Sequence, residues 1–136
     1  MSKQALTGCR ILILEDDYYQ AYDATEILKG AGAIIIGCRA RSLDLTELQA
    51  LGSVDIALLD VNLGGKHSFG FARLLQSRRI PCVFVTGYDA DVVPSDLSGV
   101  PVLTKPVDEA LAVATIRALW KEAPTSGGGT EDGVRH

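Results

Sequence analysis

The chain has 136 residues, of which 47% are hydrophobic and 22% are charged, and its formal net charge at pH 7 is −4. This length suits one compact domain with a core of its own and leaves no room for a second. The basic residues are scattered, so the sequence lacks the clustered positive charge that binds nucleic acid. It also lacks a membrane-spanning apolar stretch and a signal-peptide core, so we expect a cytoplasmic protein that contacts neither nucleic acid nor membrane.

The first predicted strand, Arg10 to Leu14, runs into three consecutive carboxylates, Glu15, Asp16 and Asp17. A helix is predicted to follow over Tyr18 to Ala31, from apolar residues at helical spacing and glycines at its end. Asp16 or Asp17 can cap this helix, because a carboxylate there accepts hydrogen bonds from the free N–H groups of the first turn. Capping explains one of the three carboxylates and leaves the other two unexplained.

The middle of the chain continues the alternation of strands and helices. A second buried strand is predicted over Ala33 to Cys38, and a short amphipathic helix over Leu43 to Leu51. The third strand, Val54 to Leu59, is nearly all apolar, as expected for a strand covered on both faces of a parallel sheet. Asp60 ends this strand, so its carboxylate lies at the edge where open α/β sheets form their ligand sites.

The second half of the chain repeats this alternation. Between Tyr88 and Val100 there are few helix formers and one proline, so the fourth helix should be short or frayed. The other predicted elements are a helix over Phe69 to Ser77, a strand over Pro81 to Val85 that ends at Thr86, a strand over Val100 to Leu103 that ends in Thr104-Lys105-Pro106, and a last helix capped by Asp108 that ends near Glu122.

Five strand–helix pairs predict an α/β fold with a doubly wound, five-stranded parallel sheet, flavodoxin-like in its strand order 2-1-3-4-5. This order places the ends of the first and third strands side by side, which brings together Glu15, Asp16 and Asp60. Three close carboxylates repel unless one is protonated or a hard cation such as Mg²⁺ neutralises them. Asp60 can then act as a nucleophile toward phosphorus, while Thr86 and Lys105 supply a hydroxyl and an ammonium to the phosphoryl oxygens.

In the order and separation of these residues, the chain resembles the receiver domains of two-component response regulators, over Arg10 to about Glu122. The resemblance implies that Asp60 is the phosphoacceptor and that Lys105 contacts the phosphoryl group. It also implies a cis peptide between Lys105 and Pro106, an isomer that only ~5% of X-Pro bonds adopt. The phosphoryl donor would be a sensor histidine kinase or a histidine phosphotransfer protein.

The same resemblance implies a Mg²⁺ site made by four residues. Its ligands would be Glu15, Asp16, Asp60 and the backbone carbonyl of Asn62. The alternative function is a small Mg²⁺-dependent phosphohydrolase with an aspartyl-phosphate intermediate. Such an enzyme usually needs a second acid two residues after the nucleophile, and this chain has Asn62 there. We therefore expect a signalling domain, not an enzyme, with self-catalysed phosphorylation and slow dephosphorylation as its only chemistry.

Two features distinguish this sequence within the receivers. Val102 occupies a position where receivers usually carry an aromatic residue. The stretch Phe84-Val85-Thr86-Gly87-Tyr88 is similar to the Phe-Ala-Thr-Gly-Tyr stretch of a single-domain subgroup that often pairs with histidine kinases outside the main class. By this resemblance we expect a stand-alone regulator with a receiver domain over residues 8–122. Residues 123–136 contain Pro124 and three consecutive glycines and lack apolar periodicity, so we expect a disordered tail there.

The last helix carries two apolar stripes, of which only one can face the sheet. If the stripe with Trp120 is exposed, it forms a surface for a downstream protein target or for a second copy of the chain in a homodimer. The two stripes are Leu111, Ala114, Thr115 and Ala118, and Val113, Ile116 and Trp120.

The three cysteines, Cys9, Cys38 and Cys82, lie at the beginnings or ends of predicted strands. They lack the pairwise spacing of a zinc site or of a redox motif. We therefore expect all three to be small buried thiols with a packing role.

Overall fold

The structure, a computed structural model, describes residues 4–87 and 92–122. The expected tail over 123–136 and Tyr88 lie outside the described residues. Five parallel strands form one sheet in the order β2-β1-β3-β6-β7. Numbered along the chain, these are the second, first, third, fourth and fifth strands of the sheet. The predicted doubly wound, flavodoxin-like order is therefore confirmed.

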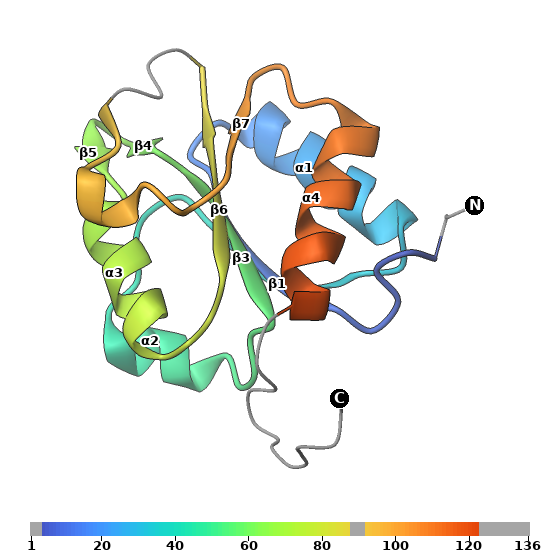
Figure 1. Ribbon diagram of the computed structural model, residues 1–136, viewed down its shortest axis with the longest axis horizontal. Coiled ribbons are helices and arrows are strands. Elements are labelled where there is room, and N and C mark those ends of the chain that lie inside the picture. Colours follow the sequence, from blue (N-terminus) through green and yellow to red (C-terminus); the bar gives the residue numbers. More distant parts are fainter. Residues whose placement is uncertain (1–3, 88–91, 123–136) are drawn as a thin grey trace.

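The helices lie on both faces of this sheet (Figure 1). Helices α2 and α3 cover one face, and α1 and α4 cover the other. The elements, in chain order, are β1 (Arg10–Leu14), α1 (Tyr18–Gly30), β2 (Ile34–Arg39), α2 (Leu45–Ala50), β3 (Ile56–Asp60), β4 (Asn62–Leu63), β5 (Lys66–His67), α3 (Phe69–Ser77), β6 (Cys82–Thr86), the 3-10 helix η2 (Ser95–Leu97), β7 (Val102–Thr104) and α4 (Glu109–Glu122).

The core is divided into two parts by the sheet, because successive side chains of a strand point to opposite faces. In β1, Ile11 and Ile13 belong to the part under α1 and α4. Leu12 and Leu14, which alternate with them, belong to the part under α2 and α3. Every residue of β3 and β6 is buried, which confirms that the central strands are covered on both faces.

The edge strand β2 is more exposed than its apolar sequence indicates. Ile34 is 47% exposed, and Cys38 is exposed as well. The predictions of a fully buried second strand and of a buried Cys38 are therefore wrong, because β2 has a neighbouring strand on one side only. Cys9 and Cys82 are buried as predicted, and burial raises the pKa of each thiol to about 12.

A two-stranded hairpin, β4–β5, lies in the loop between Asp60 and α3. Leu63 pairs with Lys66 across Gly64 and Gly65. These glycines have φ angles of 59° and 86°, which the two-residue turns of tight hairpins require and which residues with a Cβ rarely adopt. The hairpin fixes the backbone immediately after Asp60.

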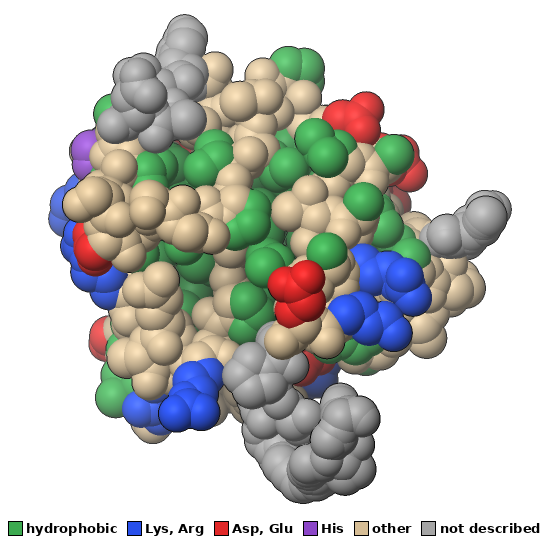
Figure 2. All heavy atoms as spheres, in the orientation of Figure 1, with side chains coloured by type: hydrophobic (Ala, Val, Ile, Leu, Met, Phe, Trp, Pro, Cys, Tyr) green, Lys and Arg blue, Asp and Glu red, His purple; other side chains and the backbone are tan. Residues whose placement is uncertain are grey.

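Helix α4 shows which of the two apolar stripes faces the sheet. Ala112 and Ile116 are buried, and Trp120 is partly buried and packs against the core under α1 and α4. Leu111 is 55% exposed. The interpretation of Trp120 as an exposed contact residue is therefore wrong. The stripe that contains Leu111 is the exposed one, and the face of the molecule that includes α4 carries hydrophobic side chains at its surface (Figure 2).

The predicted caps of the first and last helices are confirmed by hydrogen bonds. The Gln20 N–H donates to Asp17 Oδ1 over 3.0 Å at the start of α1, and the Leu111 N–H donates to Asp108 Oδ2 over 2.8 Å at the start of α4. Between β6 and β7, the described residues contain η2 and no full fourth helix, as predicted. Among the helices that the structure describes, none is long and apolar enough to cross a membrane.

Candidate functional site

The candidate site forms where four parallel strands end at one edge of the sheet. Glu15 and Asp16 follow β1, and Asp60 is the last residue of β3. Leu14 is level with Leu59 in the neighbouring strand, and Asp60 is level with Val85 of β6. The order of the strands in the sheet therefore brings the carboxylates together, as predicted from the sequence.

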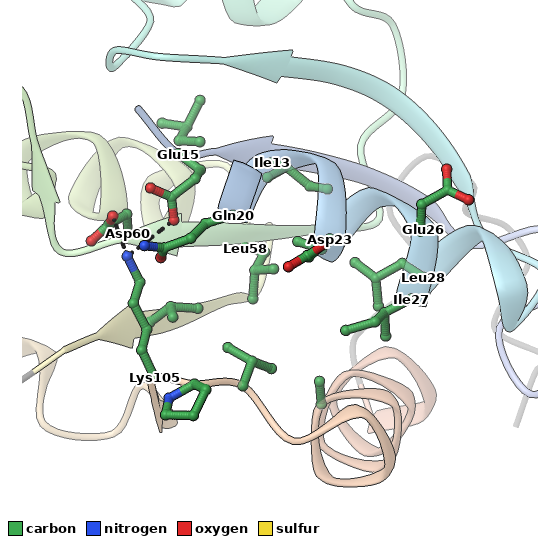
Figure 3. A pocket seen from close by; sticks show the side chains of 16 residues that line it. Ile13, Glu15, Gln20, Asp23, Glu26, Ile27, Leu28, Leu58, Asp60 and Lys105 are labelled. Atoms are coloured by element: carbon green, nitrogen blue, oxygen red, sulfur yellow. Dashed lines mark hydrogen bonds and ion pairs between the residues drawn. The ribbon is translucent and has the colours of Figure 1, made fainter. Parts of the chain in front are cut away.

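Lys105 reaches this edge from the end of β7. Its Nζ lies 2.9 Å from Asp60 Oδ2 and 3.1 Å from Glu15 Oε1 (Figure 3). The peptide between Lys105 and Pro106 is cis, which confirms the expectation from the resemblance. One ammonium thus contacts two carboxylates that come from two different strands.

Asp60 is held by contacts on both its side chain and its backbone. Its side chain is 7% exposed, and its Oδ1 accepts a hydrogen bond from the Asn62 N–H over 3.1 Å. The Ser68 hydroxyl, which is fully buried, donates to the Asp60 carbonyl over 2.8 Å. Sequence reasoning missed Ser68. Its position just before α3 is typical of a helix cap, yet its side chain makes no capping contact there.

The protonation of Glu15 depends on its burial. Burial and the neighbouring Asp60 raise the pKa of Glu15 to about 7, while hydrogen bonds from the Asp17 N–H and from Lys105 act in the opposite direction. Burial alone would lower the pKa of Lys105, but its contacts with Asp60 and Glu15 outweigh that effect and raise it. Lys105 therefore stays charged while Glu15 is close to its titration point at neutral pH.

The third carboxylate, Asp16, is exposed and accepts a hydrogen bond from the Gly64 N–H over 2.8 Å. Asp16 thereby connects the end of β1 to the hairpin β4–β5. One carboxylate oxygen each of Glu15, Asp16 and Asp60 lies within 4.8 Å of the others. Three hard oxygen donors with a single neighbouring ammonium match the preferences of Mg²⁺, so this donor set fits the ion. The side chain of Asn62 is exposed, and its backbone N–H donates a hydrogen bond to Asp60.

Thr86 ends β6, beside the strand that carries Asp60. It is 7% exposed, and its carbonyl accepts a hydrogen bond from the Lys105 N–H over 3.0 Å. Within residues 4–87 and 92–122, the Thr86 hydroxyl makes no hydrogen bond. A buried hydroxyl without a partner is costly unless it gains one in another state of the protein.

No model of a protein family matches this chain, and no curated protein matches it either. Many solved structures do match. The receiver domain of the response regulator PhyR from Erythrobacter litoralis superposes with a TM-score of 0.73 at 21% identity, over 92% of this chain and 99% of that one.

Two further neighbours have the same architecture. The response regulatory domain of mrkE from Klebsiella pneumoniae gives a TM-score of 0.69 at 18% identity, over 82% of this chain and 98% of that one. The response regulator PhyR from Brucella abortus gives 0.68 at 22% identity, over 85% of this chain and 49% of that one, so this chain spans about half its length. The chain therefore has the fold of response regulator receiver domains.

Proposed function

We propose that this protein is a response regulator receiver that accepts a phosphoryl group on Asp60 from a sensor histidine kinase or a histidine phosphotransfer protein. One observation carries the proposal: the Lys105 ammonium contacts both Asp60 and Glu15 at the sheet edge. A buried nucleophilic carboxylate, an acidic partner and a cation from a third strand are the groups that phosphoryl transfer to aspartate needs.

The cofactor in this proposal is Mg²⁺, held by Glu15, Asp16, Asp60 and the backbone carbonyl of Asn62. The proximity of the three carboxylates supports the first three ligands. The hairpin supports the fourth, because it fixes the backbone at Asn62 beside Asp60. When bound, the ion neutralises the carboxylates and part of the charge on the phosphoryl oxygens.

The transfer proceeds in the proposal by attack of an Asp60 carboxylate oxygen on the phosphorus of a phosphohistidine. A P–O bond forms and the P–N bond breaks, and the electron pair of that bond stays on the imidazole nitrogen, which takes up a proton. Lys105 stabilises the charge on the phosphoryl oxygens, and the Thr86 hydroxyl donates to one of them. Water later hydrolyses the acyl phosphate, which restores Asp60 and releases inorganic phosphate.

The donor protein would dock beside the site on the first turn of α1. Tyr18 and Tyr19 are 75% and 76% exposed, and their rings contact each other edge to face, with centroids 5.4 Å apart. They directly follow Asp17, so they lie at the margin of the carboxylate cluster. Exposed tyrosines combine a large apolar area with a polar group, and they are enriched in protein interfaces.

The output in this proposal is a protein contact. A downstream target, or a second copy of the chain, would bind the exposed stripe of α4 that contains Leu111. A cytoplasmic location belongs to the same proposal, because the kinase domains that would supply the phosphoryl group need access to Asp60.

Chemical phosphorylation tests the proposal without knowledge of the natural donor. The protein is incubated with acetyl phosphate and Mg²⁺, and its intact mass is measured. We expect the mass of one phosphoryl group per chain, and hydroxylamine should remove it because acyl phosphates react with this reagent. A mass gain that resists hydroxylamine would contradict an aspartyl phosphate.

Docking on α1 is tested separately with a kinase that phosphorylates the unaltered protein in vitro. The double substitution Tyr18→Ala and Tyr19→Ala should slow transfer from the kinase and leave the rate with acetyl phosphate unchanged. Equal rates with the kinase for both proteins would place the docking surface elsewhere.

A further inference from the structure

A cavity of about 580 Å³ lies between α1 and α4 and extends to the carboxylate cluster. Figure 3 shows it from close by, with α1 on one side, α4 on the other and Lys105 at one end. Its volume lies within the range of pockets that hold small organic molecules. Metal binding and phosphoryl transfer on Asp60 use only the end of the cavity where Lys105 lies. The remainder has no role in the proposed function.

The cavity lies beside α1, and no residue in the first half of this helix is fully buried. Leu28, near the end of the helix, is the buried residue of α1. Small side chains, Ala24 of α1 and Ala112 of α4, line the space between the two helices. Larger apolar residues at these positions would fill the space. The gap therefore follows from the sequence of the two helices.

The wall of the cavity is mostly apolar. Ile13, Leu58 and Val85 line it from three adjacent strands of the sheet. Ile27 lines it from α1, and Val107 lines it from the loop before α4. Water gains few hydrogen bonds from such a surface, whereas an apolar ligand that covers it gains roughly 25 cal/mol for each Å² removed from water. The wall thus favours a ligand with an apolar body.

The charges around the cavity are predominantly negative. Glu15, Asp23, Glu26 and Asp60 line it, together with a single cation, Lys105. Lys105 is already engaged with Glu15 and Asp60. Asp23 lines the cavity from α1 and makes no hydrogen bond or ion pair within residues 4–87 and 92–122 (Figure 3). A positive group on a ligand would therefore find an unengaged carboxylate, and a negative group would be repelled.

We propose that this cavity binds a small amphipathic organic cation. The apolar body of the ligand lies against Ile13, Leu58 and Val85, and its ammonium or guanidinium group pairs with Asp23. The volume accommodates a small molecule, the wall selects for an apolar body, and the lining carboxylates select for positive charge. This binding does not depend on phosphorylation of Asp60.

Three probes of equal chain length separate apolar from charged recognition: octylamine, octanol and octanoate. Near neutral pH the first is cationic, the second neutral and the third anionic. Each is titrated into the unphosphorylated, isotope-labelled protein, and backbone amide shifts are followed by NMR. We expect octylamine to bind most tightly and octanoate least, with the largest shifts at Ala24, Val85 and Ala112. Equal affinities for the three probes, or no binding of octylamine, would overturn the proposal.

Substitutions then locate the ligand. Asp23→Asn, which preserves side-chain shape, should weaken octylamine binding about fivefold and leave octanol unaffected, as expected for one exposed ion pair. Glu122→Gln is the matched control, because Glu122 is an exposed carboxylate that does not line the cavity, and it should change neither affinity. Equal loss of octylamine binding in both variants would indicate a nonspecific charge effect and overturn the assignment to Asp23.

A variant that fills the cavity supplies the steric test. Ala24→Leu keeps good helix propensity in α1 and should abolish binding of both octylamine and octanol, with amide dispersion confirming that the protein is folded. Undiminished binding to folded Ala24→Leu would place the ligand outside the cavity. If that variant fails to fold, the Asp23→Asn comparison still decides the proposal. Every arm uses unphosphorylated protein, so its result is independent of whether Asp60 accepts phosphate.

Discussion

The Nζ atom of Lys105 lies 2.9 Å from the Oδ2 atom of Asp60, and the same ammonium reaches Glu15. Without a metal ion, one cation therefore offsets two buried carboxylates. Burying a charge costs free energy unless a partner compensates it, so the stability of the domain should respond to the protonation of Glu15, to Lys105 and to divalent cations.

Stability should fall with rising pH when no metal is present. Burial raises the pKa of Glu15 to about 7 from an ordinary value of 4.5. Between these values the folded protein holds a proton that the unfolded chain has lost, so its free energy of unfolding decreases as pH rises. Between about pH 5 and pH 8 the unaltered protein should lose on the order of 2 kcal/mol of unfolding free energy, measured by urea unfolding in EDTA. Glu15→Gln should remove this loss. An unchanged pH slope in the variant would contradict this origin.

Lys105→Met should destabilise the metal-free protein by about 1–3 kcal/mol near pH 8, because it leaves the two carboxylates without a cation. The loss should be smaller near pH 5, where Glu15 is protonated, and smaller again in millimolar Mg²⁺. Thermal unfolding under these three conditions measures it. Lys121→Met is the control, since Lys121 is exposed on the last turn of α4 and should have little effect. If both variants lose the same stability, Lys105 does not stabilise the two carboxylates more than an exposed lysine does.

Millimolar Mg²⁺ should raise the melting temperature of the unaltered protein, because a ligand that binds only the folded state stabilises it by mass action. Asp16→Asn should reduce that gain. Asp17→Asn is the matched control, because Asp17 is the neighbouring carboxylate outside the cluster and asparagine caps a helix equally well. A gain that is lost equally in both variants would mean that the ion binds without using the cluster.

The two faces of α4 should respond differently to truncation. Trp120 packs against the core, so Trp120→Ala should cost about 2–4 kcal/mol of unfolding free energy. Leu111 is 55% exposed, and Leu111→Ala should change stability little. If α4 forms the proposed contact between copies, the Leu111 variant should also reduce self-association in analytical ultracentrifugation. Self-association that is lost only with Trp120→Ala, in a stable protein, would restore the original interpretation of that residue.

Much of the fold could be predicted from the sequence, because the elements follow from local residue patterns and their arrangement follows from the topology of open α/β sheets. The apolar run before Asp60 indicated a buried strand, and the rule for open α/β sheets then placed Glu15, Asp16 and Asp60 at one edge. The approach of Lys105 followed from the same order of strands. Each inference required only the type of element and its place in the sequence.

The remaining features depend on tertiary context, which residue patterns do not contain. Trp120 and Leu111 both belong to apolar stripes, and only the packed structure shows which stripe meets the sheet. Cys38 is exposed because its strand lies at the edge. Leu6 precedes the expected start of the domain and yet is fully buried. Its N–H donates to the Ala31 carbonyl, a contact that no local sequence pattern predicts.

The most direct test of the account is the intact mass of the unaltered protein and of the Asp60→Asn variant after incubation with acetyl phosphate and Mg²⁺. The variant keeps the shape of the side chain and removes the nucleophile. We expect one phosphoryl group on the unaltered protein, slower addition to Thr86→Ala, and none on Asp60→Asn with its fold intact. A phosphoryl group on folded Asp60→Asn, or none on the unaltered protein, would contradict the assignment of Asp60 as phosphoacceptor.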